Sequence, residues 1–169
     1  MPAGRTYTPI ARTTASGSVS SVTFSSISGN YTDLILVCNL GKSNSGAQFG
    51  FQFNSDTGTN YSFTEIKGDG SSVGGSRANN QSIINVSYNV VADSNIQSNI
   101  ITHFQNYSNT TTYKTIISRS NSASSAYPGT SAVVGLWRST SAITSITAKP
   151  SAGTITDGST FTLYGIAAA

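Results

Sequence analysis

The chain has 169 residues, a length that most simply forms one domain with its own hydrophobic core. Charged residues make up 9% of it, against about 25% in an ordinary soluble domain, and the net charge is +3. No run of Lys or Arg forms the basic patch that nucleic-acid binding requires, and no apolar run is long enough to span a membrane. We therefore expect neither a nucleic acid nor a membrane as a partner.

Hydroxyl and amide side chains take the place of the missing charges. Ser and Thr together account for 52 residues and Asn for 14 more. Disorder would also require few aromatic and β-branched residues, whereas this chain has 8 Tyr, 7 Phe and 1 Trp. The composition predicts a β-rich core beneath a surface of hydroxyls and amides, which is suited to packing against neighbours because few ions must be desolvated.

The first segment, residues 1–15, is polar and contains two prolines. We expect it to form an extended N-terminal arm that docks on an acidic partner surface or on a sister copy. The interface residues expected in this arm are Arg5, Tyr7, Pro9 and Arg12. A frayed terminus is the ordinary alternative.

Residues 16–169 are expected to form a single domain. Apolar and polar residues alternate along most of this part; Phe49, Phe51 and Phe53, for example, share one face of a predicted strand. Such alternation predicts half-buried antiparallel strands. The fold class that we expect is all-β, an antiparallel, jelly-roll-like β-sandwich of about ten short strands. The predicted strands cover residues 19–26, 34–38, 47–54, 60–67, 83–91, 96–104, 112–118, 132–138, 142–148 and 160–166.

Two further segments have simple interpretations. Residues 68–80 (GDGSSVGGSRANN) lack an apolar anchor and predict a mobile, exposed loop, for which a functional role is possible. Cys38 ends the apolar run 31–38 and is the only cysteine, so it predicts a small buried hydrophobe and excludes an intrachain disulfide.

Asp56-Thr57-Gly58 is the tripeptide that carries the catalytic carboxylate of aspartic proteases. Those enzymes need two such carboxylates sharing a proton, and no second copy of the tripeptide is present. The aromatic runs on either side predict the two strands of a hairpin, with Gly58 at the left-handed position of the turn. We interpret Asp56 as a turn residue.

The remaining polar residues form no pattern typical of catalysis. His103 is the only histidine and falls on the strand face opposite Ile100 and Phe104, which favours a surface or interface histidine. The six acidic residues are scattered singly, so no glycosidase pair or metal cluster can be nominated. We expect no catalytic residue, no metal and no cofactor, and hence not an enzyme.

Tyrosines beside Asn and Asp leave a binding role open. Tyr31, Tyr61, Tyr107 and Tyr113 stand in the strings NYTD, TNYS and QNYSNTTTY. These residue types stack on sugars and bind their hydroxyls, but strand ends at the rim of a core have the same composition. We favour the rim interpretation.

Several strings, in this order, resemble a recurrent family of small phage virion proteins from cyanophage and other marine phages. The likeness covers nearly the whole chain, and its strings are YTPIA, VTFSSISGNYTDLILVC, DTGTNYS, NYSNTTTYKT, GLWRSTSAITSIT and GSTFTLYGI. It implies a structural role on the phage particle and supplies no catalytic motif.

Together with the size, the few charges and the missing enzyme site, the resemblance favours a capsid decoration (cement) protein of a tailed phage. Such a protein is expected on the exterior of the capsid after synthesis in the host cytoplasm, bound to the major capsid protein as a homo-oligomer, a trimer above all. Deleting residues 1–15 is then expected to release it from particles without unfolding it. The alternative is a tail or fibre module that binds host surface polysaccharide.

Overall fold

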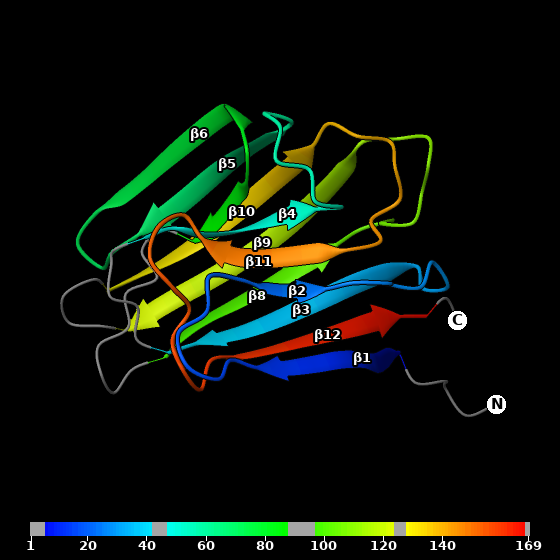
Figure 1. The fold of residues 1–169 in the computed structure, drawn as a ribbon. Helices are drawn as coiled ribbons and strands as arrows, with labels where there is room; N and C mark the ends of the chain where they lie inside the picture. The colour runs from blue at the N-terminus through cyan, green and yellow to red at the C-terminus, as the bar shows by residue number, and fades with distance from the viewer. Residues whose placement is uncertain (1–5, 42–46, 88–96, 124–127, 168–169) are drawn as a thin grey trace.

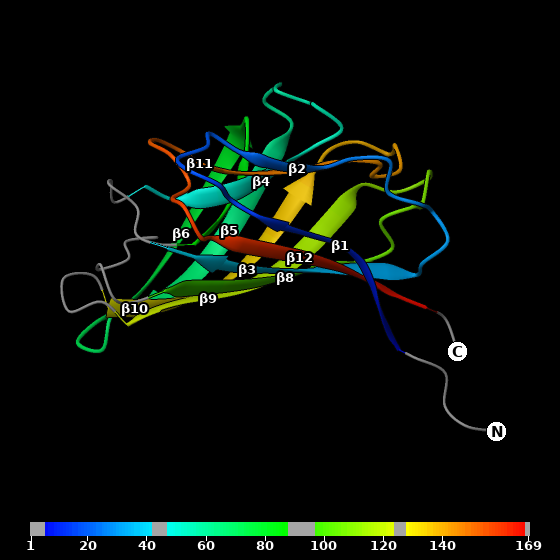
Figure 2. The same ribbon diagram turned by 60° about the horizontal axis from the view of Figure 1, so that its bottom comes forward.

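The computed structural model describes residues 6–41, 47–87, 97–123 and 128–167. Within these ranges the regular secondary structure consists of β-strands only. The strands form two antiparallel sheets packed face to face (Figures 1 and 2). The expected all-β antiparallel sandwich is confirmed. The strands are β1 (Tyr7–Thr14), β2 (Val22–Phe24), β3 (Asp33–Leu40), β4 (Phe49–Phe53), β5 (Tyr61–Gly68), β6 (Val73–Gln81), β7 (Ile84–Ser87), β8 (Ser98–Phe104), β9 (Lys114–Ala123), β10 (Pro128–Trp137), β11 (Ile146–Pro150) and β12 (Thr160–Ile166).

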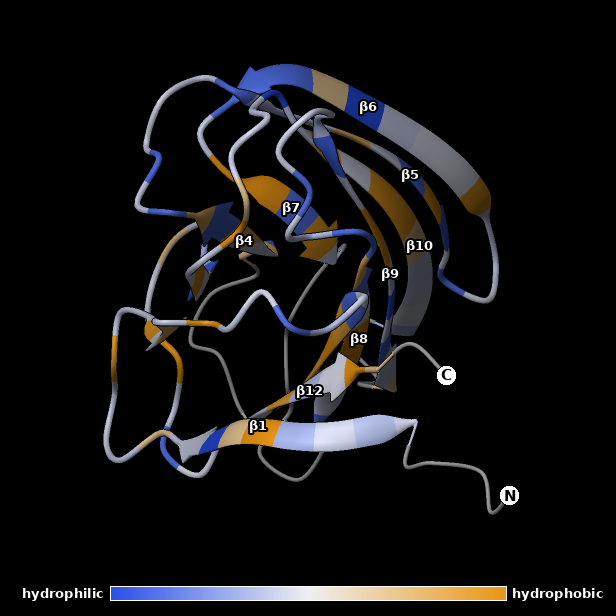
Figure 3. Cartoon of the chain, turned by 90° about the vertical axis from the view of Figure 1, so that its right-hand side faces the viewer, coloured by the Kyte–Doolittle hydropathy of each residue, from blue (hydrophilic) through white to orange (hydrophobic). Residues whose placement is uncertain are grey.

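The two sheets differ in size. The larger has eight strands in the order β1-β12-β3-β8-β9-β10-β5-β6, and the smaller has four in the order β2-β11-β4-β7. Figure 3 shows the larger sheet curling from β6 round to β1, with β4 and β7 on the inside of the curve. The larger sheet therefore has a concave inner face, which is covered by the smaller sheet, and a convex outer face.

The core lies between the sheets and is rich in aromatic rings. Phe51 of β4 contacts Phe104 of β8 with ring centroids 5.6 Å apart, and Phe53 contacts both Phe104 and Trp137 at 5.8 and 5.5 Å. All three phenylalanines of β4 are buried, as their alternation predicts. Cys38 of β3 is also fully buried, which confirms its interpretation as a core residue.

One glycine fixes how closely the sheets approach. Gly135 of β10 lies on the inner face, where Ile84 of β7 packs against it. A Cβ atom at position 135 would lie 2.5 Å from Cγ2 of Ile84 and 2.9 Å from Cγ1 of Ile116. Because both isoleucines are fully buried and stiff at χ1, neither can move away cheaply. Only glycine fits there.

The structure changes the picture of the N-terminal arm. Residues 7 to 14 do not stand apart from the domain, because they form β1, an edge strand paired with β12 from Tyr7↔Ile166 to Thr14↔Thr160. Ile10 also packs against the core. Removing this strand would expose the hydrogen-bonding edge of β12, so we now expect deletion of residues 1–15 to destabilise the fold. Residues 1–5 lie outside the described residues.

Residues 68–80 do not form the loop that we expected. Most of them belong to β6, which pairs with β5 from Gly68↔Val73 to Tyr61↔Gln81. The connecting turn is closed by Asp69, whose carboxylate accepts hydrogen bonds from the backbone N–H groups of Ser72 and Ser71 at 2.7 and 2.9 Å. These bonds favour the ionised form and lower the pKa of Asp69. The strand was missed because backbone pairing, and not burial, holds it in place.

The hairpin expected around Asp56 is also corrected. β4 belongs to the smaller sheet and β5 to the larger one, so residues 54–60 cross from one sheet to the other. The left-handed residues of this crossing are Asn54 and Ser55, with φ of 51° and 57°, and Gly58 has no positive φ. Alternation reveals which residues share a face, but not which sheet a strand joins. Of the predicted strand 83–91, residues 88–91 lie outside the described residues.

We predict that Gly135→Ala lowers the free energy of unfolding by about 1–3 kcal/mol, because the added methyl group overpacks the contact with Ile84. The matched control is Gly74→Ala on β6, where the nearest atom to a new Cβ, Cε of Lys67, is 3.8 Å away. The control should change stability by no more than about 0.5 kcal/mol. Urea unfolding followed by circular dichroism measures both, and equal stabilities for the two variants would contradict this account of the sheet contact.

Candidate interaction surface

The outer face of the larger sheet carries apolar side chains in the positions where a half-buried antiparallel sheet normally carries polar ones. Those named below come from seven of the eight strands: β1, β12, β3, β8, β9, β10 and, next to the far edge, β5. We call this surface the convex face. Its larger apolar members are Tyr7, Tyr164, Ile35, Val37, Ile101, Ile117, Val134 and Ile66.

Strand register makes these residues neighbours. Tyr164 lies opposite Ile35, and Val37 lies opposite Ile101. On the next strands Ile117 lies opposite Val134. Side chains directly opposite in an antiparallel pair are in contact range, so these positions form apolar pairs and not scattered single residues. Between β8 and β9, Arg119 lies opposite Ile101 and His103 lies opposite Ile117, so the apolar pairs on either side of this junction are diagonal neighbours. Contiguous exposed apolar patches of this kind mark interaction sites.

The exposure of this surface is lower on β3 than toward the two edges of the sheet, and on the edge strand β1 the exposed fraction of Tyr7 is 55%. The exposed fractions of Ile117, Val134 and Ile66 on β9, β10 and β5 are 49%, 55% and 66%. Ile35 and Val37 of β3 are only half-buried by their neighbours. Nothing within the described residues covers them, because the smaller sheet packs on the opposite, concave face.

The charges on the convex face are mainly positive. Arg12 on β1, Arg119 on β9 and Arg77 on β6 are exposed there, and none of them forms an ion pair within the described part of the chain. The only carboxylate on the outward positions of the described strands of this sheet is that of Asp33, which accepts a hydrogen bond from the backbone N–H of Asn106 at 2.7 Å and lies 3.0 Å from Nε2 of His103. His103 thus lies on the face opposite Ile100 and Phe104, as predicted, and its Nε2 is within hydrogen-bond distance of the Asp33 carboxylate.

The predicted interface residues meet at one edge of this face. Tyr7, Pro9 and Arg12 are exposed residues of β1, and the ring of Tyr7 packs edge-on against Tyr164 at a centroid distance of 6.5 Å. Arg5 lies outside the described residues. The other residues of the convex face were not predicted from the sequence. Its signal was the adjacent apolar pairs, such as Ile116–Ile117 and Val133–Val134, which place apolar groups on both faces of a strand.

The outer face of the smaller sheet is polar by contrast. Thr23 and Thr147 are joined by a hydroxyl–hydroxyl hydrogen bond of 3.0 Å across β2 and β11. Gln52 and Lys149 flank a shallow hollow of about 370 Å³ beside them. No aromatic side chain lines that hollow, so it lacks the stacking platform of a typical sugar site.

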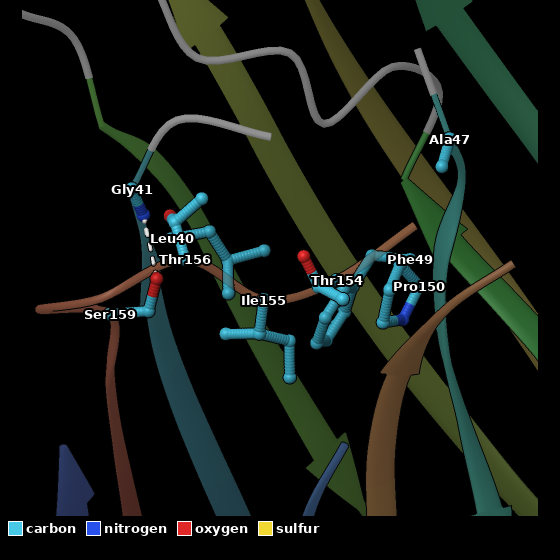
Figure 4. Close-up of a pocket in the computed structure, with 9 residues that line it drawn as sticks. All are labelled: Leu40, Gly41, Ala47, Phe49, Pro150, Thr154, Ile155, Thr156 and Ser159. Atoms are coloured by element: carbon cyan, nitrogen blue, oxygen red, sulfur yellow. Dashed lines mark hydrogen bonds between the residues drawn. The ribbon is translucent and has the colours of Figure 1, made fainter. Parts of the chain in front are cut away.

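A small cavity beside the end of β3 is too small for a ligand. A cavity of about 10 Å³ lies among Leu40, Phe49, Ile155 and their neighbours, beside the hydrogen bond of 2.9 Å from the Gly41 N–H to Oγ of Ser159 (Figure 4). Ligand pockets usually measure about 300–1,000 Å³, so this cavity could hold at most a single water molecule.

The tyrosines considered as sugar-stacking residues are mainly structural. Tyr61 and Tyr107 are fully buried, and their hydroxyls donate hydrogen bonds to the carbonyls of Asp56 and Ser28. Tyr113 is 54% exposed and stands outside the strands. These two tyrosines therefore lie in the core itself and not at its rim, and they cannot stack on a sugar.

Asp56 is a structural residue that ties the crossing between the sheets to the core. Its carboxylate accepts hydrogen bonds from Nε1 of Trp137 at 2.7 Å, from Nδ2 of Asn60 at 2.9 Å and from the N–H of Gly58 at 2.9 Å. Partial burial acts to raise the pKa of Asp56, but these three donors outweigh it, and the pKa lies below its usual value. An ionised carboxylate that is occupied in this way is not a proton shuttle, and its interpretation as a turn residue is supported.

The described residues contain no group of three or more His, Cys, Asp or Glu side chains that could hold a metal ion. No helix among them is long and apolar enough to cross a bilayer. Comparisons with protein-family models, with curated proteins and with solved structures found no match to this chain. The convex face and the polar outer face of the smaller sheet are therefore the features from which a function can be inferred.

We predict that Asp56→Asn lowers the free energy of unfolding by about 1–3 kcal/mol at pH 7, since it weakens charge-assisted hydrogen bonds to Trp137 and Asn60. A carboxylate with a lowered pKa stabilises the fold above its unfolded pKa of about 3.9, and this contribution is lost as the pH falls through the folded pKa. The difference between wild type and variant should therefore shrink below about pH 4. Urea unfolding at a series of pH values measures it.

A double-mutant cycle with Trp137→Phe isolates the contact between the indole and the carboxylate. The two substitutions together should cost less than the sum of their separate effects, because Trp137→Phe removes the hydrogen bond that Asp56→Asn weakens. Strict additivity would mean that the Asp56–Trp137 bond contributes nothing to stability.

Proposed function

We propose that this chain is a structural virion protein of a tailed phage, and specifically a capsid decoration protein that stabilises the shell by bridging capsid subunits. It acts by covering surface and performs no reaction. The proposal combines the resemblance of its strings to small virion proteins with the chemistry of its two outer faces.

The observation that carries the proposal is the convex face. Monomeric proteins rarely leave a connected apolar surface uncovered, whereas proteins that work in assemblies do so regularly. The polar face of the smaller sheet, with Thr23, Thr147 and Lys149, has the composition of a surface that stays in water. A protein with one apolar face and one hydroxyl-rich face is suited to lie flat on a larger particle.

The size of the convex face fits such a role. Eight strands spaced about 4.8 Å apart, each about seven residues long at about 3.4 Å per residue, span about 34 by 24 Å. This is about 800 Å², the area that each partner buries in a stable interface of standard size. The sheet alone could therefore provide a complete binding surface.

The strand order supports a jelly-roll interpretation of the scaffold. Without β5, β6, β9 and β10, the sheets reduce to β1-β12-β3-β8 and β2-β11-β4-β7. Successive strands then alternate between two four-stranded sheets, except at β4 and β7, which pair with each other in the smaller sheet. The four remaining strands widen the larger sheet beyond β8. We propose that this widening serves the interface, and that the protein acts as a homotrimer, a state which rests on the resemblance alone.

The copy number per virion tests the proposal. We expect gel densitometry of purified particles to give on the order of hundreds of copies, as a shell component requires, and immunogold labelling to decorate the head. A handful of copies with label on the tail would overturn it in favour of the tail or fibre module. A glycan array would then identify any polysaccharide bound.

A further inference from the structure

We infer that the convex face is the docking face, and that its partner is a trough in the capsid shell with an apolar centre and carboxylates around it. The inference rests on the proposed function and adds to it the face, the partner's chemistry and the orientation. In this orientation the smaller sheet, with its hydroxyl-rich outer face, points away from the particle.

Binding through the convex face would remove exposed apolar side chains from water. Ile117, Val134 and Ile66 keep about half or more of their surface in water in the isolated chain. Burying apolar surface contributes about 25 cal/mol per Å² of favourable free energy. These side chains are therefore suited to the buried centre of an interface. They lie on β9, β10 and β5, the strands that extend the larger sheet past β8.

The charge of the face determines the chemistry of its partner. Arg12 and Arg77 lie on the two edge strands and Arg119 lies in the middle of the sheet. On the outward positions of the described strands the single carboxylate, that of Asp33, is engaged by His103 and by a backbone N–H. Three arginines that have no ion-pair partner among the described residues therefore face outward around an apolar surface, and an acidic partner would complement them.

The same charges argue against pairing of two copies through this face. In a two-fold symmetric contact centred on the sheet, Arg119 of one copy would approach Arg119 of the other. Like charges brought together in an interface are unfavourable, so a contact between the convex faces of two copies is disfavoured. The curvature has a further consequence, because a convex surface fits a depression, such as that between adjacent subunits, better than a flat one (Figure 3).

The experiment uses phage capsids from which the protein has been stripped, and measures re-binding of the purified full chain by co-sedimentation. Arg119→Glu tests the charge, and the double variant Ile117→Ser with Val134→Ser tests the apolar anchors. Lys149→Glu is the matched charge reversal on the outer face of the smaller sheet. All are surface changes, and circular dichroism and urea midpoints check that each variant is folded.

We expect both convex-face variants to lose about tenfold or more in affinity, equivalent to about 1.4 kcal/mol, while Lys149→Glu stays within about twofold of wild type. Wild-type binding should also weaken as salt rises. Equal binding by all the variants, or loss only with Lys149→Glu, would overturn the choice of face while leaving the decoration role intact.

Two other outcomes point elsewhere. Failure of the wild-type chain itself to bind stripped capsids would overturn the proposed function and the inference with it. A change in oligomeric state caused by Arg119→Glu, measured by sedimentation equilibrium, would show that the face contacts a second copy, and would overturn the assignment to the shell.

Discussion

The packing of β4 against the larger sheet is the interaction on which the rest of this molecule depends. Phe51 and Phe53 hold the smaller sheet on the concave face through Phe104 and Trp137. Because that side is filled with aromatic rings, the apolar residues on the other side of the same strands have no partner within the described chain. The division into one buried face and one uncovered apolar face follows directly from this arrangement.

Hydrogen bonds at the crossing between the sheets fix the geometry of this packing. Asn54, in the left-handed conformation, accepts hydrogen bonds from the backbone N–H groups of Thr144 and Ser145, while Asp56 binds the indole of Trp137. The path of the chain from β4 into β5 is therefore fixed by hydrogen bonds to residues 137–145. Residues 54–60 thus fix the connection between the two sheets, although they contain the Asp-Thr-Gly tripeptide of aspartic proteases.

Prediction from the sequence succeeded where burial shapes a strand and failed where it does not. The strand at 160–166 was predicted with the bounds that the structure has, because Phe161 and Leu163 alternate into the core. β6 was missed because its sequence, VGGSRANNQ, has almost no apolar side chain and relies on backbone pairing with β5. The convex face was missed because period two assigns one face to water, whereas this sheet has apolar residues on both faces.

The buried thiol of Cys38 can report on local unfolding of the protein. It lies in the interior strand β3 with no exposed surface, and burial raises the pKa of its thiol. Since the thiolate is the reactive form, alkylating reagents can modify this side chain only after β3 has parted from the strands and rings around it. The rate of alkylation therefore depends on how often the sandwich opens into partly unfolded states. A ligand that slowed alkylation would be stabilising the packing of the two sheets.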